Sequence, residues 1–326
     1  MREIPGYYDP TDLEAWENSR ESTRQTLWKL LGVEPTVQDV KAQIESSTRY
    51  DGYSRQTIRL KTETETIGGY LFLPEGPGPH PAILYCHWHG GQYEIGKDEM
   101  LGTNATPLPP GPTLARLGYV IFGIDAPGFG ERNGHQAQHP AGAAGELDAA
   151  KKLLWQGQTL WGKTLVDDLI ALDYLAERPE VDANRIGVTG ISMGSTRAWW
   201  IMALDDRPKA ASCTACMTRY QDLIEARALA AHGIYYFVPG ILRHFDTEVI
   251  IALAAPRAML FQTGDQDAGS PAAGVRKIGH AVSRVYQAMG RSENFQSILY
   301  PGIGHVYTPE MWERTVSWFS QHLKSV

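Results

Sequence analysis

The chain has 326 residues, of which 43% are hydrophobic and 21% are charged, the balance of a folded globular protein rather than a disordered one. Its formal net charge is −7 and it contains no dense basic run, which argues against a nucleic-acid partner. No stretch approaches the roughly 18 apolar residues of a membrane span, and the N-terminus lacks the apolar core of a signal peptide. We therefore expect a cytoplasmic protein, with homo-oligomerisation left open.

The first 50 residues are predicted to form a helical extension that packs on the main domain. Thr11 and Glu14 have the spacing of a capping box, and Gly32 supplies a C-terminal stop. From residue 56 the pattern changes to period two, so segments 57–61 and 67–73 are predicted to pair antiparallel. A role of the extension as a lid or a dimer contact is an alternative.

Residues 51–326 alternate short apolar runs with helical stretches, which predicts one α/β domain with a mostly parallel central sheet and helices on both faces. Strands are expected at 82–86, 119–124, 186–189, 210–215, 258–262 and 295–299, and helices at 112–117, 163–177, 193–204, 272–289 and 308–323. A loop insertion at 126–160 and a cap-like segment at 218–250 interrupt this rhythm. Both follow strand ends, where open α/β sheets place their binding loops.

Three cysteines, Cys86, Cys213 and Cys216, are too few for a disulfide framework. Cys213 and Cys216 form a C-x-x-C pair, a spacing that redox and zinc sites use. No second pair completes a zinc site, and the small residues around this pair are typical of a buried strand. We therefore expect buried free thiols.

The sequence Gly-Ile-Ser-Met-Gly at 190–194 stands between a predicted strand and a predicted helix, the context of a nucleophile elbow. Side chains at Gly190 and Gly194 would clash in so tight a turn. The turn lifts the Ser192 hydroxyl out of the sheet. It also places the Met193 N–H at a helix N-terminus, where developing negative charge is stabilised. A glycine-rich turn with an incidental serine is the alternative.

A serine nucleophile needs a base and a group that orients the base, and in this kind of fold the acid precedes the histidine along the chain. Asp265 and Asp267 follow the strand at 258–262, and both are candidates for the acid. His305 follows the last strand and is the expected base. His280 and His322 fall within or at the end of predicted helices instead.

These motifs resemble the α/β-hydrolase superfamily, and within it the branch of dienelactone hydrolase-like and acetyl xylan esterase-like proteins. The resemblance runs from about residue 55 to the C-terminus and also rests on Cys-His-Trp-His-Gly-Gly at 86–91 and on the loop at 125–132. It implies Asp267 as the triad acid, because Asp267 is the last residue of a Gly-x-x-Asp motif. Dienelactone hydrolases have a cysteine where this chain has Ser192, so the lactone-cleaving activity itself is not implied.

The second oxyanion N–H is expected from the turn after the strand at 82–86. The resemblance implies the His89 backbone N–H, but Trp88 replaces the family's usual glycine, so residues 88 and 89 stay alternatives. Trp88, Tyr235 and Phe237 are predicted to line a substrate pocket, although such aromatics more often belong to a core. His87 and His89 also suggest a metallohydrolase, an alternative without a third ligand at matching spacing.

The sequence therefore predicts a serine carboxylic ester hydrolase that acts through Ser192, His305 and Asp267 and an acyl-enzyme intermediate, without a cofactor. Small or medium esters, such as short acyl or acetylated-sugar esters, are the expected substrates. A peptidase or acyltransferase with the same triad is the first alternative, although the chain has no room for the propeller of prolyl-oligopeptidase-type peptidases. A ligand receptor on a hydrolase fold is another.

Overall fold

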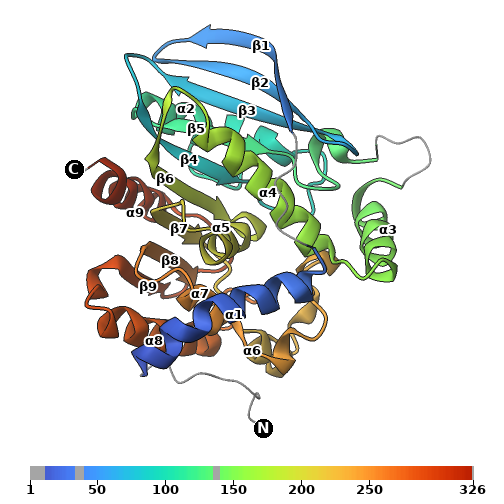
Figure 1. Cartoon of the computed structure of the whole chain (residues 1–326), viewed down its shortest axis with the longest axis vertical. Coiled ribbons are helices and arrows are strands. Elements are labelled where there is room, and N and C mark those ends of the chain that lie inside the picture. The colour runs from blue at the N-terminus through green and yellow to red at the C-terminus, as the bar shows by residue number, and fades with distance from the viewer. Residues whose placement is uncertain (1–11, 34–39, 135–139, 325–326) are drawn as a thin grey trace.

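The computed structural model describes residues 12–33, 40–134 and 140–324. Its strands form one nine-stranded sheet in the order β1-β2-β3-β5-β4-β6-β7-β8-β9 (Figure 1). The pairs β1–β2, β2–β3 and β3–β5 are antiparallel, and the other five pairs are parallel. The predicted mostly parallel sheet is therefore confirmed. The strands are Lys41–Tyr50 (β1), Tyr53–Lys61 (β2), Thr66–Pro74 (β3), His80–Cys86 (β4), Val120–Ile124 (β5), Val181–Ile191 (β6), Ala210–Thr214 (β7), Ala258–Gly264 (β8) and Phe295–Tyr300 (β9).

Helices cover both faces of the sheet, as the alternation of side chains along β4 illustrates. Ala82 and Leu84 belong to the core on the side of α4 and α5, whereas Ile83 and Tyr85 belong to the core on the side of α2 and α9. The predicted two-faced covering is therefore confirmed. The helices are Leu13–Leu31 (α1), Pro110–Arg116 (α2), Gly142–Trp155 (α3), Leu160–Ala176 (α4), Met193–Leu204 (α5), Tyr220–Glu225 (α6), Thr247–Ala252 (α7), Ala272–Ala288 (α8) and Pro309–Phe319 (α9).

The N-terminal segment is helical only in part. The Asp12 side chain caps α1 by accepting from the Ala15 N–H, and Gly32 ends the helix with a φ of 69°. The predicted cap Thr11 lies outside the described residues. The helical prediction is wrong for residues 41–50, which form β1 and pair with β2. That residues 1–50 form a unit separate from 51–326 stays a prediction.

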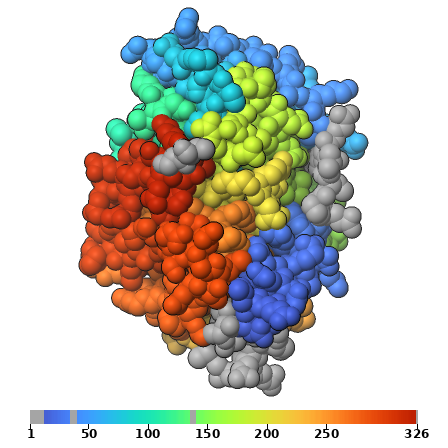
Figure 2. Space-filling view, turned by 60° about the vertical axis from the view of Figure 1, so that its left-hand side comes forward, coloured from blue at the N-terminus to red at the C-terminus, as the bar shows by residue number. Residues whose placement is uncertain are grey.

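Helix α1 packs against the C-terminal half of the chain, which Figure 2 shows as blue atoms beside orange and yellow ones. The Arg20 guanidinium donates to the carbonyls of Leu253 and Ala255, each at 2.8 Å. Leu27 and Leu31 are buried in the same core as α4 and α5. No helix in the described part of the chain is long and apolar enough to cross a membrane.

Candidate active site

Ser192 occupies a strained turn between β6 and α5, with φ of 59° and ψ of −119°. The turn lies against the end of β4. A Cβ added at Gly190 would lie 2.3 Å from the Cys86 carbonyl oxygen, and one at Gly194 would lie 1.9 Å from it. Both glycines are therefore required by the close approach of β4, as the sequence pattern predicts.

The structure brings Ser192, His305 and Asp267 into one hydrogen-bonded line. The His305 Nε2 atom lies 2.8 Å from Ser192 Oγ, and His305 Nδ1 lies 2.8 Å from Asp267 Oδ2. A carboxylate only accepts, so Nδ1 carries the proton and Nε2 accepts from the serine hydroxyl. Asp267 is 1% exposed, whereas the His305 side chain is 36% exposed, so the line opens to solvent at the histidine.

The two candidate acids have separate partners. Asp267 Oδ1 accepts from the Gly269 N–H at 2.8 Å, which leaves Oδ2 for His305. Asp265 Oδ1 instead accepts from the Gly302 N–H at 2.8 Å and so joins the loop after β8 to the turn after β9. The geometry groups Asp267 with His305 and gives Asp265 the position of a loop cap.

Residues 88 and 89 also differ in the fate of their backbone N–H groups. The Trp88 N–H donates to Glu99 Oε2 at 2.7 Å, so it is already used. Glu99 lies in a 3-10 helix, Gly96–Leu101, and also accepts from the Tyr85 hydroxyl. Burial raises the pKa of Glu99 to about 7. Glu99 therefore occupies the N–H of Trp88 but not the N–H of His89.

The imidazoles of His87 and His89 use all four ring nitrogens in hydrogen bonds within the chain. His87 Nδ1 lies 2.7 Å from the Trp88 carbonyl oxygen, and its Nε2 accepts from the Ala126 N–H. His89 Nδ1 accepts from the Gly91 N–H, and its Nε2 lies 2.7 Å from Glu146 Oε2. No cluster of three metal-ligating side chains occurs in residues 12–33, 40–134 and 140–324. The geometry gives the metallohydrolase alternative no support.

The three predicted pocket aromatics take different positions. The Tyr235 ring stacks on the His89 imidazole, with centroids 5.0 Å apart and planes at 23°. Trp88 is half-buried beside Gly90, where its indole occupies the space that a Cβ would need. Phe237 instead lines a separate apolar cavity in the segment 218–250. Tyr235 therefore lies against His89, whereas Phe237 lines a different cavity, and that cavity is not lined by Trp88 or Tyr235.

A buried ion pair joins α5, the helix that follows the elbow, to α4. The Arg197 guanidinium of α5 makes paired hydrogen bonds to the Asp168 carboxylate of α4, and its Nη1 approaches the His87 carbonyl oxygen at 3.4 Å. Both side chains of the pair are buried. Sequence reasoning missed Glu99, Glu146, Asp168 and Arg197 because no local motif marks them. Cys86, Cys213 and Cys216 are buried free thiols, as predicted.

The fold and the elbow define an α/β-hydrolase, and comparisons with known proteins agree. The model of the prolyl oligopeptidase family matches residues 143–326. A protein of Bacillus subtilis (strain 168) named "Putative hydrolase YtaP" is 33% identical over 308 residues, which cover 93% of this chain and 100% of that protein. The chain therefore belongs to the prolyl oligopeptidase family of serine hydrolases and is a hydrolase.

Solved structures share the same fold at low sequence identity. The glucuronoyl esterase from Solibacter usitatus superposes with a TM-score of 0.70 at 17% identity, over 98% of both chains. The acetyl xylan esterase from Paenibacillus sp. R4 gives a TM-score of 0.61 at 20% identity, over 99% of this chain and 97% of that one. Methylesterase BT1017 gives 0.69 at 23% identity over 94% of this chain, which spans 64% of that protein's length.

Proposed function

We propose that the protein is a serine carboxylic ester hydrolase whose catalytic residues are Ser192, His305 and Asp267. The observation that carries the proposal is the hydrogen-bonded line from Ser192 Oγ through His305 to Asp267, with both spacings at 2.8 Å. This is the arrangement that turns a weakly nucleophilic hydroxyl into an attacking group. Its position at an elbow between β6 and α5 puts the hydroxyl at the carboxyl end of β6.

The proposed reaction has two halves. Ser192 Oγ attacks the ester carbonyl carbon while its proton passes to His305 Nε2, and Asp267 stabilises the imidazolium that forms. His305 then donates this proton to the departing alcohol oxygen as the C–O bond breaks. In the second half, water gives a proton to His305, attacks the acyl-enzyme and releases the acid. Ser192 Oγ regains its proton from His305, and no cofactor takes part.

Two backbone N–H groups are proposed to hold the oxyanion of the tetrahedral intermediates. Met193 is the first residue of α5, and the first amides of a helix have no partner within it. The second donor is the His89 N–H, since Glu99 takes the N–H of Trp88. Such a pair, fixed before the reaction begins, stabilises the developing charge by about 3 kcal/mol or more for each donor.

Small or medium esters, such as short acyl or acetylated-sugar esters, are the proposed substrates. The structural neighbours named as acetyl xylan and glucuronoyl esterases support an ester substrate. At their low sequence identity, the property that this chain shares with them is the fold. The exposed His305 supports an alcohol portion that stays partly in solvent, as a sugar would.

A peptidase activity is the second candidate, because the matching family is named after prolyl oligopeptidase. The residues before that match do not build a propeller in the described part of the chain. They supply β1 to β5 of the same nine-stranded sheet, so no propeller from this part of the chain covers the site. This architecture favours esters over peptides.

The test varies the acyl group of an ester series and compares each ester with the anilide that has the same acyl group. Purified protein is assayed with p-nitrophenyl acetate, butyrate, octanoate and decanoate, with acetylated xylose, and with the matching p-nitroanilides. We expect ester hydrolysis that is highest for short acyl groups, resists EDTA and stops with a fluorophosphonate. The intact mass should then show one adduct, absent from Ser192→Ala. Faster anilide cleavage would favour the peptidase, and EDTA-sensitive activity without an adduct would overturn the proposal.

A further inference from the structure

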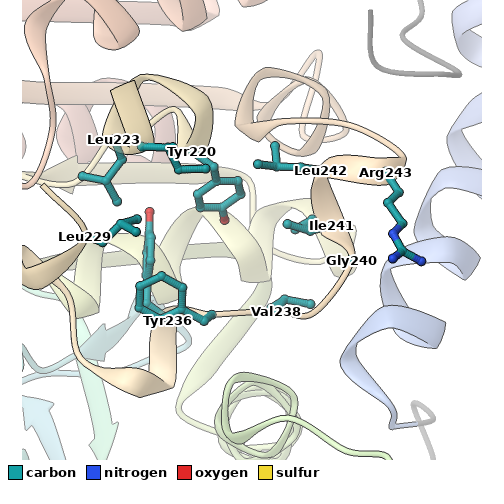
Figure 3. A pocket seen from close by; sticks show the side chains of 11 residues that line it. Tyr220, Leu223, Leu229, Tyr236, Val238, Gly240, Ile241, Leu242 and Arg243 are labelled. Carbon is teal, nitrogen blue, oxygen red and sulfur yellow. The ribbon is translucent and has the colours of Figure 1, made fainter. Parts of the chain in front are cut away.

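An apolar cavity of about 370 Å³ lies within the segment 218–250, and the three proposed catalytic residues do not line it. Its walls come from α6 and from three 3-10 turns, Leu229–Ala231, Ile234–Tyr236 and Ile241–Arg243 (Figure 3). The volume falls in the range of sites that bind small organic molecules.

The cavity is apolar both inside and at its mouth. Leu223, Val238 and Ile241 are buried in its walls. Three large hydrophobic side chains around it remain exposed to water: Ile224 at 50%, Leu229 at 43% and Phe237 at 39%. Exposed apolar groups that gather around a hollow, rather than scatter singly, mark a surface that binds something.

One buried polar atom at the cavity, the Tyr236 hydroxyl, lacks a well-formed hydrogen bond to the part of the chain that the structure describes. Tyr236 is 4% exposed, and its hydroxyl makes no hydrogen bond of good geometry among the described residues, where the side chains of Thr218 and Tyr220 are its polar neighbours. In Figure 3 this side chain lies between Leu223, Leu229 and Tyr220. A buried hydroxyl without a partner costs about 1–3 kcal/mol, and a ligand atom that pairs with it would recover this cost. Burial raises the pKa of Tyr236 well above its usual range, so the hydroxyl stays neutral and able to donate.

The lining offers no charge to the interior. Among the described residues that line the cavity, Arg243 alone is charged, and its side chain extends away from the other lining residues (Figure 3). An anionic ligand would lose its hydration here without gaining an ion pair. The cavity therefore favours an uncharged molecule.

Aromatic rings connect the lining of this cavity to His89. Tyr235 stacks on His89 on the active-site side, and the neighbouring Tyr236 lines the cavity. The centroids of the two tyrosine rings lie 6.1 Å apart, at 77° to each other. Tyr236 also stacks on His232, with centroids 4.0 Å apart. The two neighbouring tyrosines therefore face different surroundings, Tyr235 the His89 imidazole and Tyr236 the cavity.

We propose that this cavity is a second binding site, for a small uncharged molecule that has an apolar ring or short chain and one hydrogen-bonding oxygen. The ring or chain contacts Leu223, Val238 and Ile241, and the oxygen pairs with the Tyr236 hydroxyl. Binding does not depend on turnover at Ser192, so it holds whatever ester the protein cleaves.

The test titrates the protein with 2-naphthol at pH 7, where this probe is uncharged, by isothermal calorimetry. Leu229→Asp places a charge at the mouth, and Leu117→Asp is the matched control, because Leu117 is similarly exposed at 41% and does not line the cavity. Tyr236→Phe removes the hydroxyl and keeps the ring. Circular dichroism and thermal melting establish that each variant is folded.

We expect one naphthol to bind wild type and Leu117→Asp with equal affinity. Tyr236→Phe should bind it about tenfold more weakly, which is the factor expected for one hydrogen bond. Leu229→Asp should not bind it. Absence of binding to wild type overturns the proposal. So does binding that Leu229→Asp leaves unchanged, because the naphthol would then sit elsewhere, for example near Ser192. A wild-type dimer that Leu229→Asp dissociates, without naphthol binding, would instead identify the apolar mouth as a contact between two copies of this chain.

Discussion

At the scale of single residues, Asp265 and Asp267 form a natural matched pair for mutagenesis. They lie two residues apart, each carboxylate accepts a backbone N–H at 2.8 Å, and Asp267 is the one that also contacts His305. We expect Asp267→Asn to lower kcat about 10⁴-fold, because the amide cannot hold the required histidine tautomer. Asp265→Asn should stay within a few-fold of wild type, since an amide oxygen still accepts from Gly302. Steady-state kinetics with p-nitrophenyl acetate measures both, and the reverse ranking would give the acid role to Asp265.

Glu99 gives the folded protein a pH-dependent stability. Its pKa is about 7 in the buried site, against an ordinary value of 4.5. Between these values the unfolded chain releases a proton that the folded chain retains, so the unfolding free energy falls as the pH rises and levels off above about pH 7. Glu99→Gln should remove this fall, a difference of at most roughly 3 kcal/mol.

Urea unfolding at pH 5, 6, 7 and 8 measures this difference. Glu313→Gln, at an exposed position of α9, is the control and should follow the wild-type pH dependence. Parallel curves for Glu99→Gln and wild type would mean that Glu99 is ionised throughout this range.

The residues that sequence reasoning found and missed differ in a physical way. Ser192 and its two glycines are marked by a local backbone requirement, and Asp267 and His305 follow strand ends, where the fold places such groups. Glu99, Glu146 and Arg197 act through pairings across 11, 57 and 29 residues, respectively. Their partners carry no periodicity or spacing that a sequence pattern can reveal, so only the three-dimensional structure brings them together.

At the scale of elements, the pair of Arg197 and Asp168 joins α5 to α4 in the core. Arg197→Met should lower the unfolding free energy by about 3–5 kcal/mol, because it leaves the Asp168 carboxylate buried without a partner. Arg197→Met combined with Asp168→Leu should lose clearly less. Urea unfolding measures both, and Arg185→Met, which breaks a partly exposed pair with Asp182, should cost at most about 1 kcal/mol. A double variant at least as unstable as Arg197→Met alone would contradict this account.

The error at residues 41–50 also belongs to this scale. Every residue of β1 is exposed, so the segment has neither the period-two alternation nor the continuous apolar run from which the other strands are predicted. Its strand conformation comes from pairing with β2, in which Lys41 opposes Lys61 and Tyr50 opposes Tyr53. A strand that is held by backbone pairing alone cannot be predicted from a pattern of buried side chains.

At the scale of the whole molecule, α1 joins the common core although it precedes the sheet in sequence. Leu27→Ala should lower the unfolding free energy by about 2–5 kcal/mol and shift one cooperative transition, because Leu27 packs in the core that α4 and α5 share. Urea curves followed by tryptophan fluorescence and far-ultraviolet circular dichroism should coincide. Leu154→Ala, at an exposed position, should change stability by about 0.5 kcal/mol or less. Separate transitions would support the predicted division at residue 50.

The contact between the Cys86 carbonyl and the hollow left by Gly190 and Gly194 also bears on how the chain reaches its final topology. Cys86 opposes Gly190 in the pairing of β4 with β6. A side chain at Gly190 or Gly194 would meet this carbonyl, so the end of β4 reaches its place in the sheet only where both positions lack a Cβ. The two glycines are therefore also required for the observed pairing of β4 with β6 at the centre of the sheet. A chain that misaligns these strands has no reactive turn, so assembly of the site and correct strand alignment are one event.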